Sequence, residues 1–582
     1  MIIPLAVAAA LAVTLLVPAA TDRAPTAPVE KTLYHDAPSG MYLLESGWST
    51  RPDPRGVGLR QRWQDATATA GFRPVAVPNA FNAGDLSRSS FRGRVQWYRV
   101  HFTLPEAPDA LAWRVRFESV NIDATVWLNG ALIGHHRGAY LPFEFDLRGI
   151  KSGMNEIAVR VDSRGRASDL PPANRKRGWW NFGGILREVY LRKIGTFDVS
   201  APQVTATPGH PATVDLRAQA RNAAAAGSLG YEISVTGPGG FSLIRHGNAG
   251  RVEAGANAQI HESFSIPDAR LWSPSDPALY ELSLRVTGGQ VTPVTFGVRS
   301  WSLSRDGHLL LNGQRILLRG ASFHEQTAQH GAALTPPNRS EIVRELQAIG
   351  ANFARQHYPP HPALLEAFDR TGIVFWEQIP VWRVRDRQLR RAAFRDTALA
   401  DLREAILRDR NHASVAAWSV SNETLRGGAG ERAYFHAARV LQARLDPTRL
   451  LAADKSLRPL GDIPSSYRLL DAIGLNEYVG WYGGTTRELP GNLAGVRRRF
   501  PRQALVITEF GAEANRSGAA SQKGTYAFQQ RFLAAHLAVF DRTPALSGAL
   551  VWVLRDFVVR PGWTGGNPHP RPPTLFKGLF RQ

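Results

Sequence analysis

The spacing of apolar residues changes near residue 300, and this change limits the possible folds more than any other feature. Before that point, short segments alternate apolar and polar residues, as in RVRFESV, ATVWLNG, FEFDL and NEIAVRV. A period of two is typical of strands with one buried face. After it, continuous apolar runs alternate with segments of helical spacing. The chain of 582 residues therefore joins an all-β part to an α/β part, and is too long for one compact domain.

The all-β part divides into two predicted sandwiches. Residues 30–195 have short strands separated by Gly, Asn and Asp turns, which predicts a jelly-roll sandwich, and Leu128–Gly130 (LNG) is a hairpin-turn candidate. Residues 196–297 continue the pattern in ATVDLRAQA, GYEISVTG and LYELSLRVTG. Their spacing suits an immunoglobulin-like sandwich of about 100 residues.

The α/β part, residues 298–582, predicts a (β/α)8 barrel. Eight apolar runs follow one another: LLRGASF, ANFARQHY, IVFWEQ, VAAWSVSN, LLAADKS, DAIGLNEY, ALVITEF and ALVWVLRDF. Helical segments separate them, such as NRSEIVRELQAIGAN, where we expect Ile342, Val343, Leu346 and Ile349 to share a buried face. In this fold, polar residues at the C-terminal ends of the strands converge on one active-site face.

The formal net charge of +21 raises the question of a nucleic-acid partner, since basic surfaces bind phosphate. The basic residues are scattered along the chain, however, and only seven of the 70 are lysines. Without a basic tail, zinc-finger spacing or RNA-binding signature, we expect no nucleic-acid partner. The lack of cysteine excludes thiol catalysis and Cys-ligated metals. No spacing of His, Asp and Glu predicts a metal site, and we expect no organic cofactor.

Residues 1–20 look like a secretory signal peptide. IIPLAVAAALAVTLLVPAA is a short apolar run that ends in small residues, with a cleavage site near Ala19 or Ala20. It departs from the usual pattern because no Lys or Arg precedes the apolar run. We expect a secreted or periplasmic protein; the alternative is a membrane anchor, if the segment is retained.

Two glutamates follow apolar runs at positions that the barrel would bring together. Glu423 ends the fourth run and Glu509 lies in the seventh. Two carboxylates at one barrel mouth suit glycoside hydrolysis, in which one protonates the leaving oxygen and the other meets the developing positive charge on the anomeric carbon. The alternative is that each is a capping or ion-pairing acid on a loop.

Several segments resemble glycoside hydrolase family 2, the family of β-galactosidases, β-glucuronidases and β-mannosidases. RDRNHASVAAWSVSNE (Arg408 to Glu423) is similar to its acid/base signature, and ITEFGAE to its nucleophile segment. FARQHYPPHPALLEAFDRTGIVFWEQIP resembles its second and third barrel strands, RGWWNFGGILREVYL the end of its sugar-binding domain, and GLNEYVGWY its glucuronidase branch. The resemblance covers nearly the whole chain.

The resemblance implies that Glu423 is the general acid/base and Glu509 the nucleophile of a retaining mechanism. It implies substrate-binding roles for Asn422, Tyr478, His357, Arg355, Trp552, Asn476 and Lys577. Asn422 would bind the sugar 2-hydroxyl, Tyr478 would hydrogen-bond the nucleophile, and Trp552 would offer a platform for the sugar. We expect a guanidinium near Glu509 to lower its pKa. Structural alternatives remain: loop capping for Asn422, packing for Tyr478 and Trp552, and a core position for His357.

The sequence also departs from the family pattern. Leu575 stands where an Asn-x-Lys pair would place asparagine before Lys577, and Gly178 stands where an aspartate commonly precedes two aromatic residues. Arg175, Lys176 and Arg177 lie beside that position, which suggests contact with an acidic sugar; an exposed basic loop is the alternative. The family usually continues into a last barrel helix after the segment matching KGL, whereas this sequence stops at Gln582; either the helix is missing or the gene is shortened.

Together these features predict a retaining, exo-acting hydrolase of terminal β-D-glycosides, of the β-glucuronidase or β-galactosidase type. The competing hypothesis is a catalytically weakened carbohydrate-binding protein on the same scaffold. The sequence is compatible with a monomer and with a homo-oligomer, and it identifies neither the sugar nor the aglycone.

Overall fold

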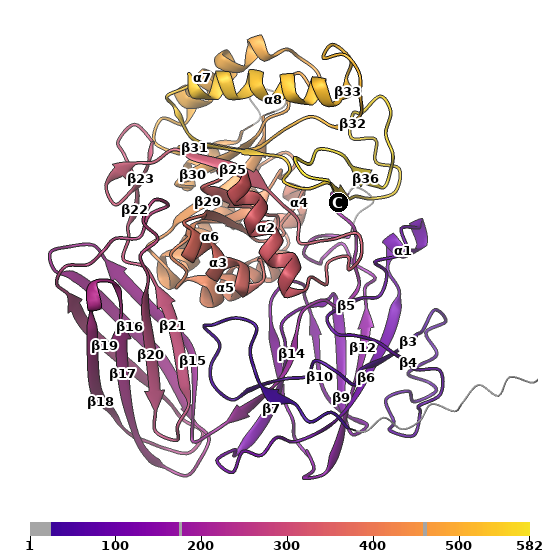
Figure 1. The fold of residues 1–582 in the computed structure, drawn as a ribbon, viewed down its shortest axis with the longest axis vertical. Helices are drawn as coiled ribbons and strands as arrows, with labels where there is room; N and C mark the ends of the chain where they lie inside the picture. Colours follow the sequence, from indigo (N-terminus) through magenta and orange to yellow (C-terminus); the bar gives the residue numbers. More distant parts are fainter. Residues whose placement is uncertain (1–24, 174–176, 458–462, 582) are drawn as a thin grey trace, which may run out of the picture.

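The computed structural model describes residues 25–173, 177–457 and 463–581. A barrel lies above two β-sandwiches, with the immunoglobulin-like sandwich at the lower left of Figure 1 and the N-terminal sandwich at the lower right. Within the described ranges, no helix has both the length and the apolar character needed to cross a bilayer. The predicted signal peptide or anchor, residues 1–20, lies outside them.

The N-terminal sandwich has two antiparallel sheets that enclose an apolar core, as expected for a jelly roll. The first sheet has the order β1 (Val29–Glu30), β2 (Met41–Leu43), β14 (Val189–Ile194), β7 (Ala112–Phe117) and β11 (Phe143–Asp146). The second has the order β10 (Ala131–Arg137), β9 (Asp123–Leu128), β12 (Met154–Asp162), β6 (Val95–Thr103), β3 (Ser49–Pro52) and β4 (Arg73–Pro74). Shorter elements are β5 (Asn79–Ala80), β13 (Gly184–Ile185), β8 (Val120–Asn121) and α1 (Arg88–Arg92).

The predicted hairpin turn after Leu128 joins β9 to β10. Leu128 pairs with Ala131 across two central residues, Asn129 and Gly130. Their φ angles are 51° and 83°. A turn with positive φ at both central residues matches the right-handed twist of a hairpin, and Asn followed by Gly is the pair that adopts it most readily. The LNG prediction is confirmed.

The second sandwich packs a three-stranded sheet on a four-stranded sheet around its own core, which is the immunoglobulin-like arrangement. The first sheet contains β15 (Phe197–Thr207), β16 (Ala212–Asn222) and β19 (Asn257–Ile266). The second contains β18 (Ser242–Val252), β17 (Gly227–Thr236), β20 (Tyr280–Val286) and β21 (Val291–Phe296), with the short helix η1 (Pro238–Gly240). A small sheet, β22 (Trp301–Leu303), β23 (Leu309–Leu311) and β24 (Gln314–Arg315), leads into the barrel.

Eight parallel strands close the barrel in sequence order, one for each predicted apolar run. They are β25 (Leu318–Ser322), β26 (Phe353–Arg355), β27 (Val374–Gln378), β28 (Val415–Asn422), β29 (Leu450–Ser456), β30 (Ala472–Asn476), β31 (Ala504–Phe510) and β34 (Leu546–Val551). The predicted position of the eighth strand was too far along the chain. The strand begins at Leu546 and ends at Val551, and Phe557 belongs to a separate short strand. The remaining strands are β32 (Ala514–Arg516), β33 (Gly524–Thr525), β35 (Phe557–Val558) and β36 (Thr574–Leu575).

Helices cover the outside of the barrel. They are α2 (Pro336–Ala348), α3 (Pro362–Thr371), α4 (Asp386–Leu389), α5 (Ala392–Asp409), α6 (Ala429–Leu445), α7 (Leu489–Arg499) and α8 (Tyr526–Asp541), with η2 (Ser465–Leu469) and η3 (Thr486–Glu488). Ile342, Val343 and Leu346 of α2 are buried as expected. Ile349 is an exception: α2 stops before it, so it is the exposed C-cap residue instead of part of the buried face.

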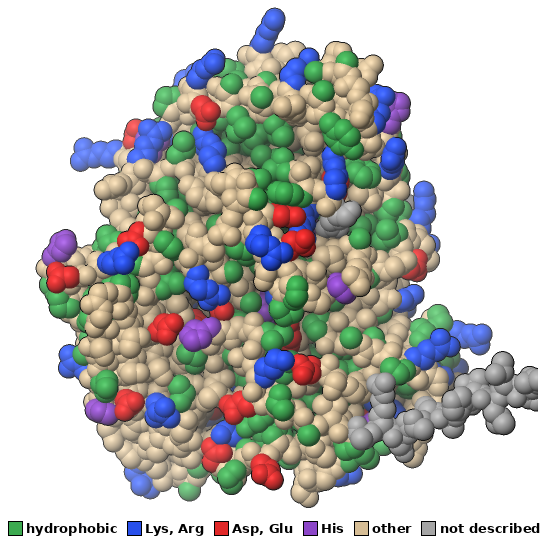
Figure 2. Space-filling view, in the orientation of Figure 1, with side chains coloured by type: hydrophobic (Ala, Val, Ile, Leu, Met, Phe, Trp, Pro, Cys, Tyr) green, Lys and Arg blue, Asp and Glu red, His purple; other side chains and the backbone are tan. Residues whose placement is uncertain are grey.

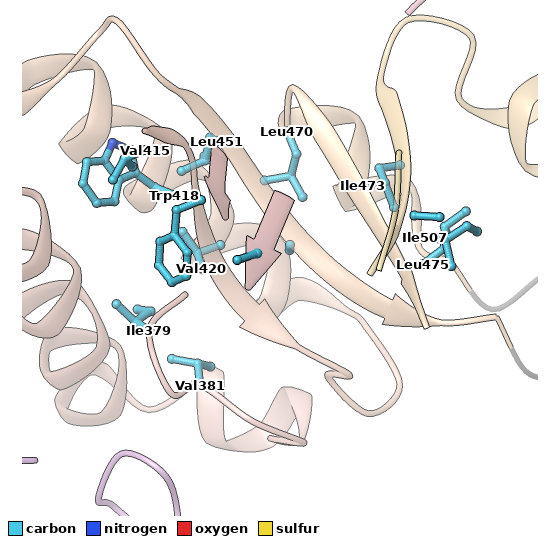
Figure 3. Close-up of a cluster of buried hydrophobic side chains, with 14 of the residues drawn as sticks. Ile379, Val381, Val415, Trp418, Val420, Leu451, Leu470, Ile473, Leu475 and Ile507 are labelled. Carbon is cyan, nitrogen blue, oxygen red and sulfur yellow. The ribbon is translucent and has the colours of Figure 1, made fainter. Parts of the chain in front are cut away.

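The two faces of each barrel strand have different surroundings. Residues that point outward, among them Val420, Leu451 and Ile473, pack in the layer between strands and helices shown in Figure 3. Inward residues are apolar at the lower end, where Phe353, Trp376, Ala417 and Ala452 join one cluster. Two residues further along each strand, the same face carries Arg355, Gln378, Ser419 and Asp454, all with 0% exposure. Every second side chain of a strand lies on the same face. Along the inward face, the barrel interior therefore changes from an apolar layer to a polar layer over two residues.

Basic side chains do not gather into one patch on the face shown in Figure 2. Lys and Arg are interspersed there with Asp and Glu.

Candidate active site

A cavity of about 550 Å3 opens at the C-terminal ends of the barrel strands. Of the nine predicted site residues, eight line it: Glu423, Glu509, Asn422, Tyr478, His357, Trp552, Asn476 and Lys577. The ninth, Arg355, lies fully buried beneath them and contacts Glu509 and Asn422. The N-terminal sandwich contributes Gly178 and Trp179 to the wall. The fold thus brings together residues from distant parts of the chain, including both carboxylates.

Glu423 follows β28 directly, and its backbone explains how an acid can end a buried strand. The register between β28 and β29 shifts between Ser419 and Asn422, and Glu423 has a left-handed φ of 50°. Such irregularities re-aim side chains near functional sites. The Glu423 N–H donates to the Asp454 carbonyl at 2.8 Å, which fixes the bend. Its carboxylate accepts from Arg383 Nη1 at 2.9 Å and from Asn476 Nδ2 at 3.2 Å.

Glu509 lies inside β31, where the register to both neighbouring strands also shifts. Its Oε1 accepts from Arg355 Nη1 at 3.1 Å, and its Oε2 accepts from the Tyr478 hydroxyl at 2.9 Å. Burial raises the pKa of Glu509 to about 7; the charge of Glu423 adds to the rise, while Arg355 and the Tyr478 hydrogen bond oppose it. The expectation of a lowered pKa was wrong, because desolvation outweighs the guanidinium.

Arg355 holds the polar layer together. Besides Glu509, its Nη2 contacts Gln378 Oε1 at 2.9 Å, Asn422 Oδ1 at 2.9 Å and Asp454 Oδ2 at 3.2 Å. Although burial opposes the charge of Arg355, Asp454 and Glu509 keep its pKa above the ordinary value. The two carboxylates are therefore linked through a continuous chain of hydrogen bonds, since Asn476 donates to both Glu423 and Asn422 Oδ1.

Asp454 is a residue that the sequence reasoning missed. It pairs in register with Asn422 and accepts from Ser419 Oγ at 2.7 Å. On the next strand, a Cβ at Gly474 would lie 1.8 Å from Asp454 Oδ1, so only glycine fits. The available signal was an aspartate inside an apolar run, LLAADKS, followed by a glycine in the next run.

An aromatic wall closes one side of the cavity. His357 lies between Trp179, with ring centroids 5.3 Å apart, and Trp552, at 4.9 Å. His357 Nε2 is 3.6 Å from Glu509 Oε1. Burial, together with the charge of Arg355, holds the pKa of His357 well below its usual range, so the ring is neutral. His357 is thus both packed in the wall and exposed to the cavity.

Lys577 lies at another side of the cavity among tyrosines. Its Nζ is 3.8 Å from the centre of the Tyr478 ring and donates to the Tyr482 hydroxyl at 3.4 Å. Burial lowers the pKa of Lys577 to about 7, opposed by the nearby charge of Glu513. Leu575, which replaces the family asparagine, also lines the cavity. Lys577 therefore faces this part of the site with a leucine at the position of the family asparagine.

Packing explains why glycine stands at position 178, where the family commonly has an aspartate. A Cβ at Gly178 would lie 2.9 Å from the Trp382 ring, so this packing has no room for an aspartate side chain. Arg175 and Lys176 of the predicted basic loop lie outside the described residues. Arg177 is buried and donates to Asn181 Oδ1 at 2.9 Å and to the Tyr140 hydroxyl at 3.4 Å. Arg177 is therefore part of the sandwich structure and does not line the cavity, so it does not belong to an exposed basic loop; contact of this segment with an acidic sugar stays a prediction.

Two arginines on the cavity wall were not predicted, Arg383 and Arg560. Arg383 comes from the loop after β27, and Arg560 lies 4.9 Å above the ring of Trp563. Both are in the loops that follow barrel strands, which is where the sequence signal is weakest. Among the residues with described positions, no group of three or more His, Asp or Glu side chains is arranged to hold a metal ion.

Comparison with known protein families gives matches in the order of the three domains. The sugar-binding domain of glycosyl hydrolases family 2 matches residues 36–195, and a second domain described as glycosyl hydrolases family 2 matches residues 198–299. The family 2 TIM barrel domain matches residues 304–562. All three belong to one family.

Individual proteins are similar over much of their length. A β-glucuronidase of Paenibacillus borealis is 25% identical over 581 residues, which cover 92% of this chain and 93% of that protein. A putative β-glucuronidase of Formosa agariphila is 26% identical; the match covers 77% of this chain but only 54% of the longer relative. The crystal structure of a Bacteroides uniformis β-glucuronidase superposes with a TM-score of 0.82 at 23% identity, covering 94% of this chain and 68% of that one.

Proposed function

The chain belongs to glycoside hydrolase family 2, and from this premise we propose that it hydrolyses terminal β-D-glycosides by a double displacement that retains the anomeric configuration. The observation that carries the proposal is the convergence of Glu423 and Glu509 on one cavity, joined through Asn476, Asn422 and Arg355. Retaining glycosidases use two carboxyl groups about 5–5.5 Å apart.

In the first step, Glu509 attacks the anomeric carbon and forms a glycosyl ester. The bond from this carbon to the leaving oxygen breaks, and Glu423 transfers its proton to that oxygen. In the second step, Glu423 takes a proton from water, the water oxygen attacks the anomeric carbon, and the Glu509 carboxylate leaves. Glu423 regains its proton, so no other reactant is consumed.

Two fixed hydrogen-bond donors support the role of Glu509 as the nucleophile. Glu509 has two donors fixed on its carboxylate, Arg355 and Tyr478. Part of the rise in its pKa comes from the charge of Glu423. Arg355 and the Tyr478 hydrogen bond favour the ionised form of Glu509 that the first step needs, whereas burial and the charge of Glu423 oppose it.

Asn422 supports recognition of the sugar next to the reacting carbon. Its Oδ1 accepts from Arg355 Nη2 at 2.9 Å and from Asn476 Nδ2 at 3.1 Å. With two donors on its oxygen, the amide is oriented so that Nδ2 can donate to a substrate hydroxyl. A contact to the 2-hydroxyl would strengthen in the transition state.

The glycone that we propose is a uronic acid, with a neutral galactoside as the alternative. Lys577 supports this assignment, because a substrate carboxylate near its Nζ would stabilise the charge that burial disfavours. The Leu575 side chain can donate no hydrogen bond, so of these two positions only Lys577 can bind the carboxylate through its side chain. Export is also part of the proposal and rests on the sequence of residues 1–20; the N-terminal mass of the protein recovered outside the cell would test it.

Aryl β-glucuronide, β-galactoside, β-mannoside and β-glucoside provide the test. We expect the wild type to hydrolyse the glucuronide fastest and to release the β-anomer first, as seen by NMR. Glu509→Gln should abolish turnover but keep the fold, whereas the surface change Glu404→Gln should alter neither. A 2-fluoro glycoside should leave a glycosyl ester on Glu509, detected by peptide mass spectrometry. Release of the α-anomer, or an ester on another residue, would contradict the mechanism.

A further inference from the structure

A second cavity adjoins the active site at Glu423. It has a volume of about 660 Å3 and shares Arg383, Glu423 and Ser456 with the first. Among the residues that the structure describes, its lining consists of Arg383, Arg385, Asp386, Arg387, Glu423, Thr424, Leu425, Arg426, Lys455 and Ser456. Glu509 does not line it. The two cavities therefore meet at the proposed acid/base, and this groove extends from it away from the nucleophile.

This position determines what the groove can hold. The general acid delivers its proton to the leaving oxygen, so the space beyond it receives the leaving group. The groove is formed by the loop after β27, the first residues of α4, the loop after β28 and the end of β29. Its volume lies within the range of about 300–1,000 Å3 that is usual for small-ligand sites.

The charge of the groove is strongly positive. Its described lining includes five basic side chains, Arg383, Arg385, Arg387, Arg426 and Lys455. The acids in the same part of the lining are Asp386 and Glu423, both of which already have partners. Asp386 accepts from Arg390 Nε at 2.7 Å and from the Glu431 N–H at 3.0 Å, and Glu423 accepts from Arg383.

Three of the guanidinium groups have no counter-ion among the described residues. Arg385, Arg387 and Arg426 are exposed, and within the described parts of the chain none of them forms an ion pair. Guanidinium groups bind carboxylate and sulfate through paired hydrogen bonds. The groove also lacks an aromatic side chain among its described lining residues, so an aryl leaving group would find no ring to stack on. Both features favour an anionic, hydrophilic leaving group.

The loops that carry these arginines are tied to each other. The Arg383 N–H donates to the Asn422 carbonyl at 2.9 Å, and the Leu425 N–H donates to the Val384 carbonyl at 2.7 Å. Arg383 and Arg426 adopt left-handed φ angles of 49° and 53°. Non-glycine residues hold such conformations only where the surroundings enforce them. The guanidinium groups are therefore presented from a fixed backbone.

We propose that this groove is a leaving-group subsite for a saccharide that carries a carboxylate or a sulfate ester. The natural substrate would then be an anionic oligosaccharide, from which the enzyme removes the terminal sugar. The inference rests on the proposed function, because it takes Glu423 as the acid/base.

The kinetic test compares disaccharides that share one glycone and differ in the leaving sugar: uronic acid, sulfated sugar or neutral sugar. We expect kcat/KM to be at least tenfold higher for one of the anionic leaving sugars than for the neutral one, and to fall as salt is raised. The double variant Arg385→Gln/Arg426→Gln should lose most of this preference, about tenfold or more, and leave hydrolysis of the aryl glycoside unchanged. Arg444→Gln, which removes an exposed arginine outside the groove, is the matched control.

A binding measurement separates this inference from the proposed function. Calorimetry with Glu509→Gln and the methyl glycoside of a uronic acid or of a sulfated sugar needs no turnover, and its two arms identify the preferred anion. Binding that weakens at least fivefold in the double variant, but not with Arg444→Gln, supports the subsite even if no glycoside is hydrolysed. Equal kcat/KM for neutral and anionic leaving sugars, or anion binding that the double variant leaves unchanged, would overturn it.

Discussion

Replacing Glu509 by Gln is expected to stabilise the folded protein at pH 8 while it abolishes hydrolysis. Glu509 has its pKa raised from the ordinary 4.5 to about 7, mainly by burial. A carboxyl whose pKa is higher in the folded state than in the unfolded state destabilises the fold once it must ionise. This penalty is absent below about pH 4.5, grows between pH 4.5 and 7, and is complete above pH 7.

The size of the effect follows from the pKa. A rise from 4.5 to about 7 corresponds to about 3 kcal/mol of lost stability at high pH, at about 1.4 kcal/mol per pKa unit. Glutamine resembles the protonated acid in shape: its Oε1 can accept from Arg355, and its Nε2 can donate to the Tyr478 hydroxyl oxygen. The gain for Glu509→Gln should therefore approach about 3 kcal/mol at pH 8 and fall below about 1 kcal/mol at pH 5.

Thermal unfolding at pH 5, 6, 7 and 8 measures this directly. For a barrel of this size, about 3 kcal/mol corresponds to a rise in Tm of about 5 °C. Glu404→Gln removes the same charge from an exposed position on α5 and should not reproduce the pH-dependent gain. A Glu509→Gln protein whose Tm is no higher than that of the wild type at pH 8, or whose gain is the same at pH 5, would refute the reasoning.

Two further changes examine the neighbours of the carboxylates. Tyr478→Phe removes a hydrogen bond that lowers the pKa of Glu509, so the acidic limb of the kcat/KM profile should move to higher pH; an unmoved limb would contradict this role. Gly474→Ala would place a Cβ 1.8 Å from Asp454 Oδ1, and the forced shift should cost about 1–3 kcal/mol in chemical denaturation and reduce kcat through Arg355. Gly491→Ala, at a position with open space, is its control, and equal losses in both variants would count against the collision.

The sequence was sufficient to predict the barrel and the two acids because both depend on local patterns. Each apolar run became a strand, and parallel strands put their C-terminal ends on one face. Glu423 and Glu509 could thus be assigned to one site although they are far apart in the chain. The roles of the surrounding residues came from resemblance and not from the apolar pattern.

What the sequence could not supply were the features that depend on register and burial. The shifts around Asn422 and Glu509 turn both acids into the cavity, but nothing in the apolar pattern marks them. Asp454 looks like an ordinary strand residue until the pairing places it beside Arg355. The pKa of Glu509 was predicted in the wrong direction because the sequence gives its charged neighbours but not the depth of its burial.

The buried arginine explains why two acids can be held so deep in a barrel. Arg355 has no exposed surface, and its charge requires counter-charges, which Asp454 and Glu509 provide. Removing Asp454 would leave Glu509 as the one ion-pair partner of Arg355 within the described residues. The Arg355 guanidinium would then lose its contact with the Asp454 carboxylate. A nucleophile tied more tightly to its counter-ion is a weaker nucleophile, so the proposed role of Glu509 predicts that the buried aspartate contributes to reactivity although it lies outside the cavity lining.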